Sequence, residues 1–231
     1  DSIENDNEGI RVNINLDDRA MILLGSHLLI CAGRTPRVNE LSLQLAGVNY
    51  SSKGINVDDR LRTSNKKVFA IGDIIGKEKF THIAAYHAGI VIKNILFRFP
   101  AKIKNKVAPR IAFTYPELAQ VGLKESLARK KFRRIRILRA PYFHNDRANI
   151  EGSTTGLIKI ITNRRGVILG ASILGESAGE LIQIWTLAIQ QRLKIGVIAD
   201  MIFPYPVFGE ISKRAGADFF LPLLLSERLK K

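Results

Sequence analysis

Gly72 and Asp73 follow a short apolar run and combine backbone freedom with a carboxylate. The run, residues 68–71, is typical of a buried parallel strand. In open α/β sheets, ligands bind at the carboxyl ends of such strands. Glycine lets the backbone approach a ligand closely, and aspartate accepts hydrogen bonds from sugar hydroxyls. The pair is therefore a candidate ligand site, and a turn closed by an Asx hydrogen bond is the alternative interpretation.

The elements around this pair predict an α/β segment. Apolar residues alternate between residues 10 and 30, which predicts strands joined by a hairpin. A further short strand is expected at 53–57. Apolar positions at helical spacing predict a helix over 82–99, which Pro100 ends.

After the linker at 101–107, the pattern changes to that of an α+β unit. Ser177 and Glu180 are spaced as a capping box, which predicts a helix from there to Leu193. Shorter helices are expected at about 195–201 and 207–217. Before them, an antiparallel meander is predicted, its last two strands joined by residues 163–166, with strands at about 110–114, 134–142, 156–162 and 167–174.

A single cysteine, Cys31, excludes an internal disulfide and a multi-cysteine zinc site. It lies in an apolar run and is expected to be a buried packing thiol. One cysteine fits a reducing compartment, so we expect a cytoplasmic protein. We expect no metal site, because His27 and His87 have no partner at metal-ligand spacing.

The chain is basic, with 36 Lys and Arg against 21 Asp and Glu and a net charge of +15. Thirteen of the basic residues lie between Arg98 and Arg139, where the acidic residues are Glu117 and Glu125. Nucleic-acid-binding surfaces usually add stacking aromatics or a reading motif, and we identify neither here. We therefore expect a solvated basic face and no nucleic-acid partner. The longest apolar runs are far shorter than the roughly 20 residues that cross a bilayer, so no membrane segment is expected.

Residues 63–73 resemble the C-terminal FAD motif of the pyridine nucleotide–disulfide oxidoreductases. In that family the aspartate, here Asp73, holds the ribityl chain of the flavin beside the glycine, here Gly72. Residues 28–36 resemble the return from the NAD domain, which implies that Gly33 lies near the nicotinamide nucleotide. The stretch that meets the flavin ring from a helix start is matched by Lys79, Phe80, Thr81 and His82.

The second half extends the resemblance to the dimerisation domain, through residues 113–122 and 170–175. The domain's last motif, His-Pro-x-x-x-Glu, supplies an acid–base dyad. Glu210 matches its carboxylate, but Tyr205 occupies the histidine position. A tyrosine titrates near pH 10, roughly, against about 6.5 for histidine, and is a poor base at neutral pH.

A tyrosine at this place is similar to mercuric reductases, where the phenol helps to handle a metal–thiolate substrate. Those enzymes carry a cysteine pair near the C-terminus, and residues 223–231 contain none. The alternative is that Tyr205 only packs at the interface between subunits. Arg147 lies in a loop, residues 143–148, that is shared with the mercuric-reductase-like branch, and a plain surface loop is its alternative interpretation.

The fold class implied is an α/β FAD-domain segment followed by an α+β dimerisation domain with an antiparallel sheet and helices. Residues 1–32 would be the tail of the NAD-binding domain, 33–105 the C-terminal segment of the FAD-binding domain, and 106–231 the dimerisation domain. The resemblance implies FAD and NAD or NADP as cofactors. It also implies a homodimer formed through residues 106–231.

The function implied is that of the C-terminal part of an FAD-dependent NAD(P)H oxidoreductase, which passes hydride through the flavin to a disulfide or a metal–thiolate acceptor. The nucleotide-binding glycine loops and the redox cysteine pair of the family are not in this sequence, so we expect no turnover by the chain alone. Because the sequence does not begin with methionine, we expect a longer native chain. Two alternatives are a flavin-free dimerisation module, with Trp185, Phe203 and Tyr205 at its interface, and a basic nucleic-acid-binding protein.

Overall fold

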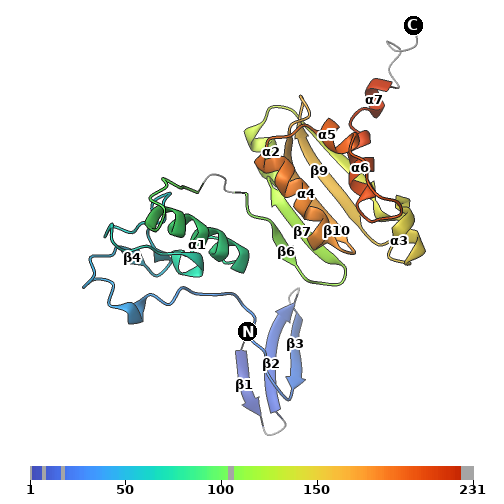
Figure 1. Cartoon of the computed structure of the whole chain (residues 1–231). Coiled ribbons are helices and arrows are strands. Elements are labelled where there is room, and N and C mark those ends of the chain that lie inside the picture. The colour runs from blue at the N-terminus through green and yellow to red at the C-terminus, as the bar shows by residue number, and fades with distance from the viewer. Residues whose placement is uncertain (1, 7–8, 17–18, 104–106, 225–231) are drawn as a thin grey trace. The chain divides into compact units, whose positions relative to one another are not determined.

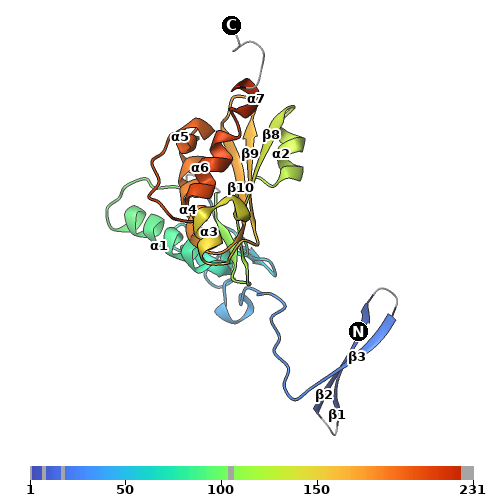
Figure 2. The same cartoon turned by 90° about the vertical axis from the view of Figure 1, so that its right-hand side faces the viewer.

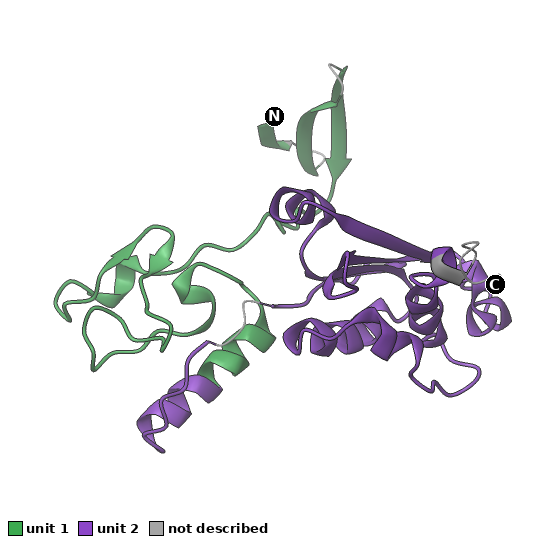
Figure 3. Ribbon diagram, turned by 90° about the horizontal axis from the view of Figure 1, so that it is seen from above, with its two compact units in different colours: residues 1–88 green, residues 89–231 purple. Residues whose placement is uncertain are grey.

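The computed structural model describes residues 2–6, 9–16, 19–103 and 107–224 of the 231-residue chain. The chain forms two compact units, residues 1–88 (unit 1) and residues 89–231 (unit 2). The division falls inside helix α1, Thr81–Ile95, which therefore contributes to both units (Figures 1 and 3). Among the described residues, no helix is long and apolar enough to cross a bilayer.

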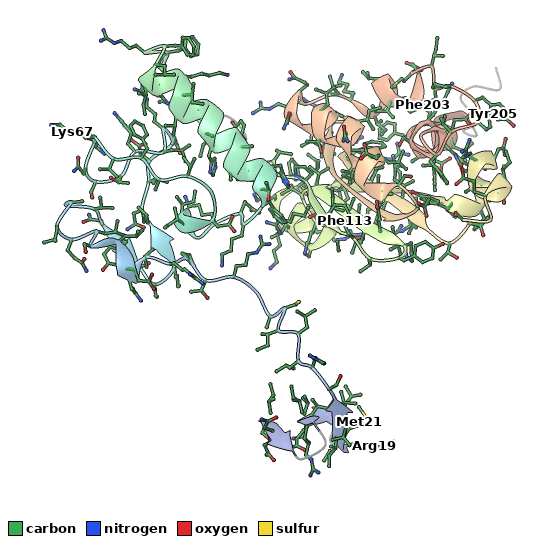
Figure 4. The ribbon with its side chains drawn as sticks, turned by 60° about the horizontal axis from the view of Figure 1, so that its bottom comes forward. Arg19, Met21, Lys67, Phe113, Phe203 and Tyr205 are labelled. Carbon is green, nitrogen blue, oxygen red and sulfur yellow. The ribbon has the colours of Figure 1, made fainter. Side chains whose placement is uncertain are left out.

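Unit 1 begins with a three-stranded antiparallel sheet in the order β1-β2-β3. Two of the strands and the hairpin between them confirm the prediction from the alternating pattern, while residues 28–30 form no strand. The apolar side chains of β3, including Met21, are 42–61% exposed (Figure 4). The strands are β1 Ser2–Asp6, β2 Gly9–Leu16 and β3 Arg19–Gly25.

Cys31 is exposed, so the expectation of a buried thiol was wrong. It follows β3 in a segment without regular structure, where Leu29 and Ile30 are 85% and 73% exposed. In the described part of the chain nothing covers these side chains, and an apolar run becomes buried only where another element packs on it.

Residues 68–71 do not form the predicted parallel strand. The backbone N–H of Thr63 donates to the carbonyl oxygen of Val68 at 3.0 Å, and that of Ala70 donates to Leu61 at 3.1 Å. One isolated antiparallel bridge joins Arg62 to Phe69. A parallel ladder needs a neighbouring strand that runs in the same direction, and this segment instead folds back on the residues just before it. The predicted strand at 53–57 is a short hairpin, β4 Tyr50–Ser51 and β5 Gly54–Ile55.

Helix α1 confirms the predicted helix but ends before the expected proline. Arg98 adopts a left-handed backbone with φ of 50°, which turns the chain out of the helix. The Asn94 side-chain amide donates to the carbonyl oxygens of Ile90, at 3.0 Å, and Ala101, at 2.9 Å. These bonds tie the end of the helix to the segment that follows it.

Unit 2 is built on a five-stranded antiparallel sheet in the order β6-β7-β10-β9-β8. The meander β8-β9-β10 confirms the prediction, with the turn at residues 163–166 between its last two strands. Strand β7 was not predicted, because residues 113–122 were interpreted only as a family motif. The strands are β6 Arg110–Ala112, β7 Glu117–Gly122, β8 Ile135–Pro141, β9 Leu157–Asn163 and β10 Ile168–Gly175.

Helices cover the sheet unequally: α4, α5 and α6 lie on one face and α2 on the other (Figure 2). Helices α4 to α6 confirm the predictions, whereas α2 and α3 were not predicted. Trp185 of α4 is fully buried in the core, where its indole N–H donates to the Ser212 hydroxyl at 3.2 Å. The helices are α2 Glu125–Lys131, η3 Tyr142–His144, α3 Asp146–Ile150, α4 Ala178–Gln190, α5 Ile195–Ala199, α6 Glu210–Ala217 and α7 Leu221–Leu224.

The start of α4 is capped by a different residue from the one expected. Ser177 has a left-handed φ of 56° and makes no side-chain capping bond, so the predicted capping box was wrong. The Glu180 carboxylate instead accepts from Gln183 at 2.8 Å. The cap comes from β7, where the Glu117 carboxylate accepts the backbone N–H of Gly179 at 2.8 Å. A carboxylate there satisfies a free donor and interacts favourably with the helix dipole.

Replacing Glu117 with glutamine is expected to lower the free energy of unfolding by about 1 kcal/mol, because it removes the charge at this helix start. Urea unfolding, followed by the fluorescence of the single tryptophan, measures the change. Glu4→Gln, at an exposed glutamate of β1 away from any helix start, is the matched control and should change stability by less than about 0.5 kcal/mol. Equal effects of the two substitutions would show that Glu117 is not the cap.

Candidate functional site

The Gly72–Asp73 pair lies at the start of a 3-10 turn, η2 Gly72–Ile75. Gly72 has a φ of +68°, and a β-carbon added there would lie 2.9 Å from the Ala84 β-carbon. Its backbone N–H donates to Nδ1 of His87 at 3.2 Å. The turn is thus fixed against helix α1, and a side chain at residue 72 would be strained and obstructed.

His87 is the residue that holds this turn, and sequence reasoning missed that role. Its side chain is 5% exposed. Burial, with a smaller contribution from the charge of Lys77, lowers the pKa of the His87 imidazole. A lowered pKa favours the neutral ring, which is the form that accepts the Gly72 N–H. The sequence places His87 within the predicted helix, but no pattern in it indicates that the imidazole bonds the Gly72 turn.

Asp73 is joined to two other segments by Arg34. The guanidinium of Arg34 lies 3.6 Å from the Asp73 carboxylate and donates to the backbone carbonyl of Lys79 at 3.3 Å. The Lys79 ammonium in turn donates to the backbone carbonyl of Arg34. Gly33, next to Arg34, has a φ of +108°, and the space where a β-carbon would stand is open. The candidates Gly33, Asp73 and Lys79 are therefore brought together, and Arg34 is the link that the sequence did not reveal.

Phe80, Thr81 and His82 form the start of α1. The rings of Phe80 and His82 stack with centroids 5.2 Å apart and planes 19° apart. The first turn of the helix carries no acidic residue, so the partial positive charge of its N-terminus is not offset there. These residues suit a flavin: Asp73 offers an acceptor for hydroxyl groups, Gly72 allows the tight turn that carries Asp73, and the helix start favours negative charge.

Tyr205 lies in the loop between α5 and α6, near Phe203 (Figure 4). Its ring is 69% exposed, and its hydroxyl donates to the Asp146 carboxylate at 3.1 Å. This hydrogen bond and the charge of Asp146 raise the pKa of the Tyr205 phenol, and the charge of Glu210 adds to the shift. The phenol is therefore held in its protonated form, as a hydrogen-bond donor.

Glu210 is the first residue of α6, and its carboxylate accepts the backbone N–H of Val207 at 3.3 Å. The structure thus gives Tyr205 and Glu210 different hydrogen-bond partners. The loop is also held by Asn145, which is 4% exposed and donates to the carbonyl of Val207 at 3.1 Å. Asn145 and Asp146 are functional candidates that sequence reasoning missed, although they lie in the segment already noted for Arg147.

The Arg147 side chain forms its ion pair within its own segment. Its guanidinium pairs with Glu151 one turn along α3. Arg214 of α6 donates to the carbonyl of His144 at 3.4 Å and so ties the end of η3 to α6. In the described residues, no group of three or more His, Cys, Asp or Glu side chains could hold a metal ion.

Replacing Asp146 with alanine is expected to lower the pKa of the Tyr205 phenol toward about 10, its ordinary value. The reason is that the carboxylate both accepts the phenol proton and repels the phenolate. Spectrophotometric titration of phenolate, compared with the same variant carrying Tyr205→Phe, isolates this residue among the five tyrosines. Glu151→Gln serves as the control, and an unchanged Tyr205 titration in Asp146→Ala would exclude the interaction.

Two family descriptions match most of the chain. Residues 1–88 match "Pyridine nucleotide-disulphide oxidoreductase", and residues 108–215 match "Pyridine nucleotide-disulphide oxidoreductase, dimerisation domain". The chain belongs to the pyridine nucleotide–disulphide oxidoreductase family. Its fold agrees with the fold class expected from sequence, a segment of the FAD-binding part followed by the dimerisation domain.

Curated members of the family are similar over nearly the whole chain. It is 32% identical to a mercuric reductase of Bacillus cereus over 219 residues, which are 94% of this chain and 35% of that protein. It is 33% identical to a dihydrolipoyl dehydrogenase of Bacillus subtilis over 215 residues, which are 92% of this chain and 46% of that protein. The chain therefore spans less than half the length of these relatives.

Solved structures of a flavoprotein disulfide reductase share the fold. An HOCl-induced flavoprotein disulfide reductase of Escherichia coli superposes with a TM-score of 0.84 at 27% identity, over 93% of this chain and 49% of that one. Its complex with Cu(II) gives a TM-score of 0.83, also at 27% identity, over 92% and 49% of the two chains.

Proposed function

We propose that these residues act as the C-terminal FAD-binding and dimerisation part of an NAD(P)H-dependent flavoenzyme. The observation that carries the proposal is the turn at Gly72–Asp73, held against α1 by His87, with Arg34 and Lys79 beside it. The family to which the chain belongs supports the assignment. The proposed acceptor is a disulfide or a metal–thiolate compound, and the chain alone is expected not to turn over.

In this proposal Asp73 accepts hydrogen bonds from the ribityl hydroxyls of FAD, and Gly72, packed against α1 with a φ of +68°, sets the turn that presents Asp73. Bound FAD would supply the redox chemistry, taking hydride from NAD(P)H and passing reducing equivalents to the acceptor. Lys79 and the start of α1, from Phe80 to His82, favour negative charge at the edge of the flavin. Gly33 leaves space for the nicotinamide nucleotide.

Tyr205 has the role of a hydrogen-bond donor, and not that of a general base. The support is its hydrogen bond to Asp146 at 3.1 Å and the raised pKa of the phenol. A base must be able to take up a proton near the working pH, and a protonated phenol cannot do so. The arrangement therefore favours an acceptor such as a metal–thiolate compound over the usual chemistry of a histidine–glutamate dyad, and Glu210 orders the loop.

The proposed assembly is a homodimer through residues 106–231, in the cytoplasm. Large side chains in unit 2 are strongly exposed: Phe113 at 82%, Tyr115 at 91% and Ile202 at 90%. Exposed apolar groups of this kind are typical of an interface. Trp185, which the dimerisation-module alternative placed at the interface, is instead fully buried within one chain, so that part of the expectation was wrong.

The test is the intact mass and flavin content of the native polypeptide, isolated from its source cells with an antibody against unit 2. We expect a species of about twice 25.8 kDa that carries FAD. The 231-residue chain, tested alone, should show no NAD(P)H oxidation. A flavin-free native protein near 25.8 kDa would instead support a stand-alone dimerisation module.

A further inference from the structure

Six arginines gather at one end of the sheet in unit 2, where three segments of the chain meet. They line two adjoining open hollows with volumes of about 470 and 460 Å³, which share Arg133, Arg134 and Arg164. One segment is the end of α2, the second leads into β8, and the third is the turn between β9 and β10. The six are Arg129, Arg133, Arg134, Arg136, Arg164 and Arg165.

The pairing of β8 with β9 brings these arginines together from segments that are distant in the sequence. Ile135, the first residue of β8, pairs with Asn163, the last residue of β9. Arg134, just before β8, and Arg164, just after β9, are therefore brought to the same end of the sheet. The Asn163 side chain accepts the backbone N–H groups of Arg165, at 2.9 Å, and Val167, at 3.0 Å. These two bonds fix the turn that carries Arg164 and Arg165.

Most of this charge has no acidic partner. Arg129 pairs with Glu125 at 2.8 Å, and the guanidinium of Arg136 lies 4.0 Å from the centre of the Phe219 ring. For the remaining four, the described residues provide no ion pair with a carboxylate. Like charges held together repel each other, and a bound anion relieves that repulsion.

We propose that the hollow lined by Arg133, Arg134, Arg164 and Arg165, which we call the arginine groove, binds a linear chain of phosphoryl groups. Guanidinium groups bind phosphate oxygens in pairs, which suits arginine better than lysine for this ligand. Two adjoining hollows give room for more than one phosphate. The chain could be that of inorganic polyphosphate or of a nucleoside triphosphate.

The groove favours phosphates over the bases of nucleic acid. Phe132 is the one aromatic residue among those that line the two hollows, and it is partly buried. Phe132 was overlooked when no stacking residue was found in the basic stretch, and so were Phe99, Phe113 and Tyr115, which do not line the two hollows. Nucleic-acid strands are usually held by several stacked bases in addition to the charge, so a single partly buried ring does not fit that ligand.

The experiment is calorimetric titration of the 231-residue chain with sodium tripolyphosphate, at about 0.15 M salt to screen diffuse attraction. We expect one site per chain. The double variant Arg133→Gln/Arg164→Gln should weaken binding by about tenfold or more, because it removes two charged contacts to phosphate. The control Lys67→Gln/Lys213→Gln changes the net charge equally at exposed residues elsewhere, and it should weaken binding by less than about twofold. Circular dichroism checks that both variants are folded.

The same titration with ATP and with a thymidine oligonucleotide distinguishes the ligands. If ATP binds as tightly as tripolyphosphate, the groove is assigned to nucleotides. If ATP binds much more weakly, the groove is assigned to inorganic polyphosphate. Both results support the proposal. Equal losses in the two double variants, or no binding of tripolyphosphate and ATP by the wild type, would overturn it. The proposal would also be overturned if the oligonucleotide bound more than about tenfold tighter than tripolyphosphate and its affinity fell about fivefold in Phe132→Leu. Such a fall is the effect expected from the loss of a stacked base.

Discussion

Alanine at position 73 is expected to weaken FAD binding by the proposed complete flavoenzyme about tenfold or more, because a hydrogen bond to a charged group contributes roughly 1.5–3 kcal/mol. The Asp73 side chain is 43% exposed and free to accept from a polyol on its open side. Without the carboxylate, Arg34 also loses its ion-pair partner at 3.6 Å. Ultrafiltration, with fluorescence of the released flavin, measures the loss.

Asp59→Ala is the matched control for this prediction. Asp59 is an exposed aspartate of the same unit, outside the Gly72–Asp73 turn and the start of α1. It should leave flavin retention as in the wild type. If Asp73→Ala and Asp59→Ala retain flavin equally, the proposed role of Asp73 is wrong, even where the intact mass shows a complete flavoenzyme.

Replacing Trp185 with alanine is expected to reduce the free energy of unfolding of unit 2 by about 3–5 kcal/mol. The indole is the largest fully buried side chain of the core and bonds the Ser212 hydroxyl at 3.2 Å. Its removal leaves a cavity beneath α4 and a buried hydroxyl without its donor. Urea unfolding followed by far-ultraviolet circular dichroism gives the change, since the variant has no tryptophan.

Two further variants separate the contributions of packing and hydrogen bonding at this site. Trp185→Phe keeps most of the ring volume and should cost about 1–2 kcal/mol, mainly for the lost hydrogen bond. Gln183→Ala, at an exposed position of the same helix, should change stability by less than about 0.5 kcal/mol. A Trp185→Ala effect no larger than that of Gln183→Ala would contradict the assigned core.

Sequence patterns predicted those elements whose signal lies within a few residues. The turn at residues 163–166, which predicted the last hairpin, and the helical spacing after Ser177 correspond to the β9–β10 connection and to α4. Where the outcome depended on a distant partner, the predictions were wrong. Residues 68–71 have the composition of a parallel strand, yet a strand exists only where a neighbour pairs with it. The cap of α4 comes from Glu117, which is 62 residues from its partner Gly179.

In the candidate site, too, local features were predicted and contacts between distant residues were not. The sequence motif predicted that Gly72, Asp73 and the start of α1 belong to one site, and the structure brings them together in unit 1. No local pattern pointed to Asp146 as the partner of Tyr205, since 59 residues separate them. The arginine groove was equally hidden, because Arg134 and Arg164 meet only through the pairing of β8 with β9.

The strand order β6-β7-β10-β9-β8 also bears on the order in which the strands pair during folding. Strand β8 pairs with β9, and β9 pairs with β10, so these contacts form between strands that are consecutive in the chain. The β7–β10 pair instead closes a loop that contains all of α2, β8, α3 and β9. Loop closure costs more entropy as the loop lengthens, and non-local pairing slows folding. We therefore expect strands β8, β9 and β10 to pair first and β6 and β7 to be added to them. The Glu117 cap of α4 then forms in that later step.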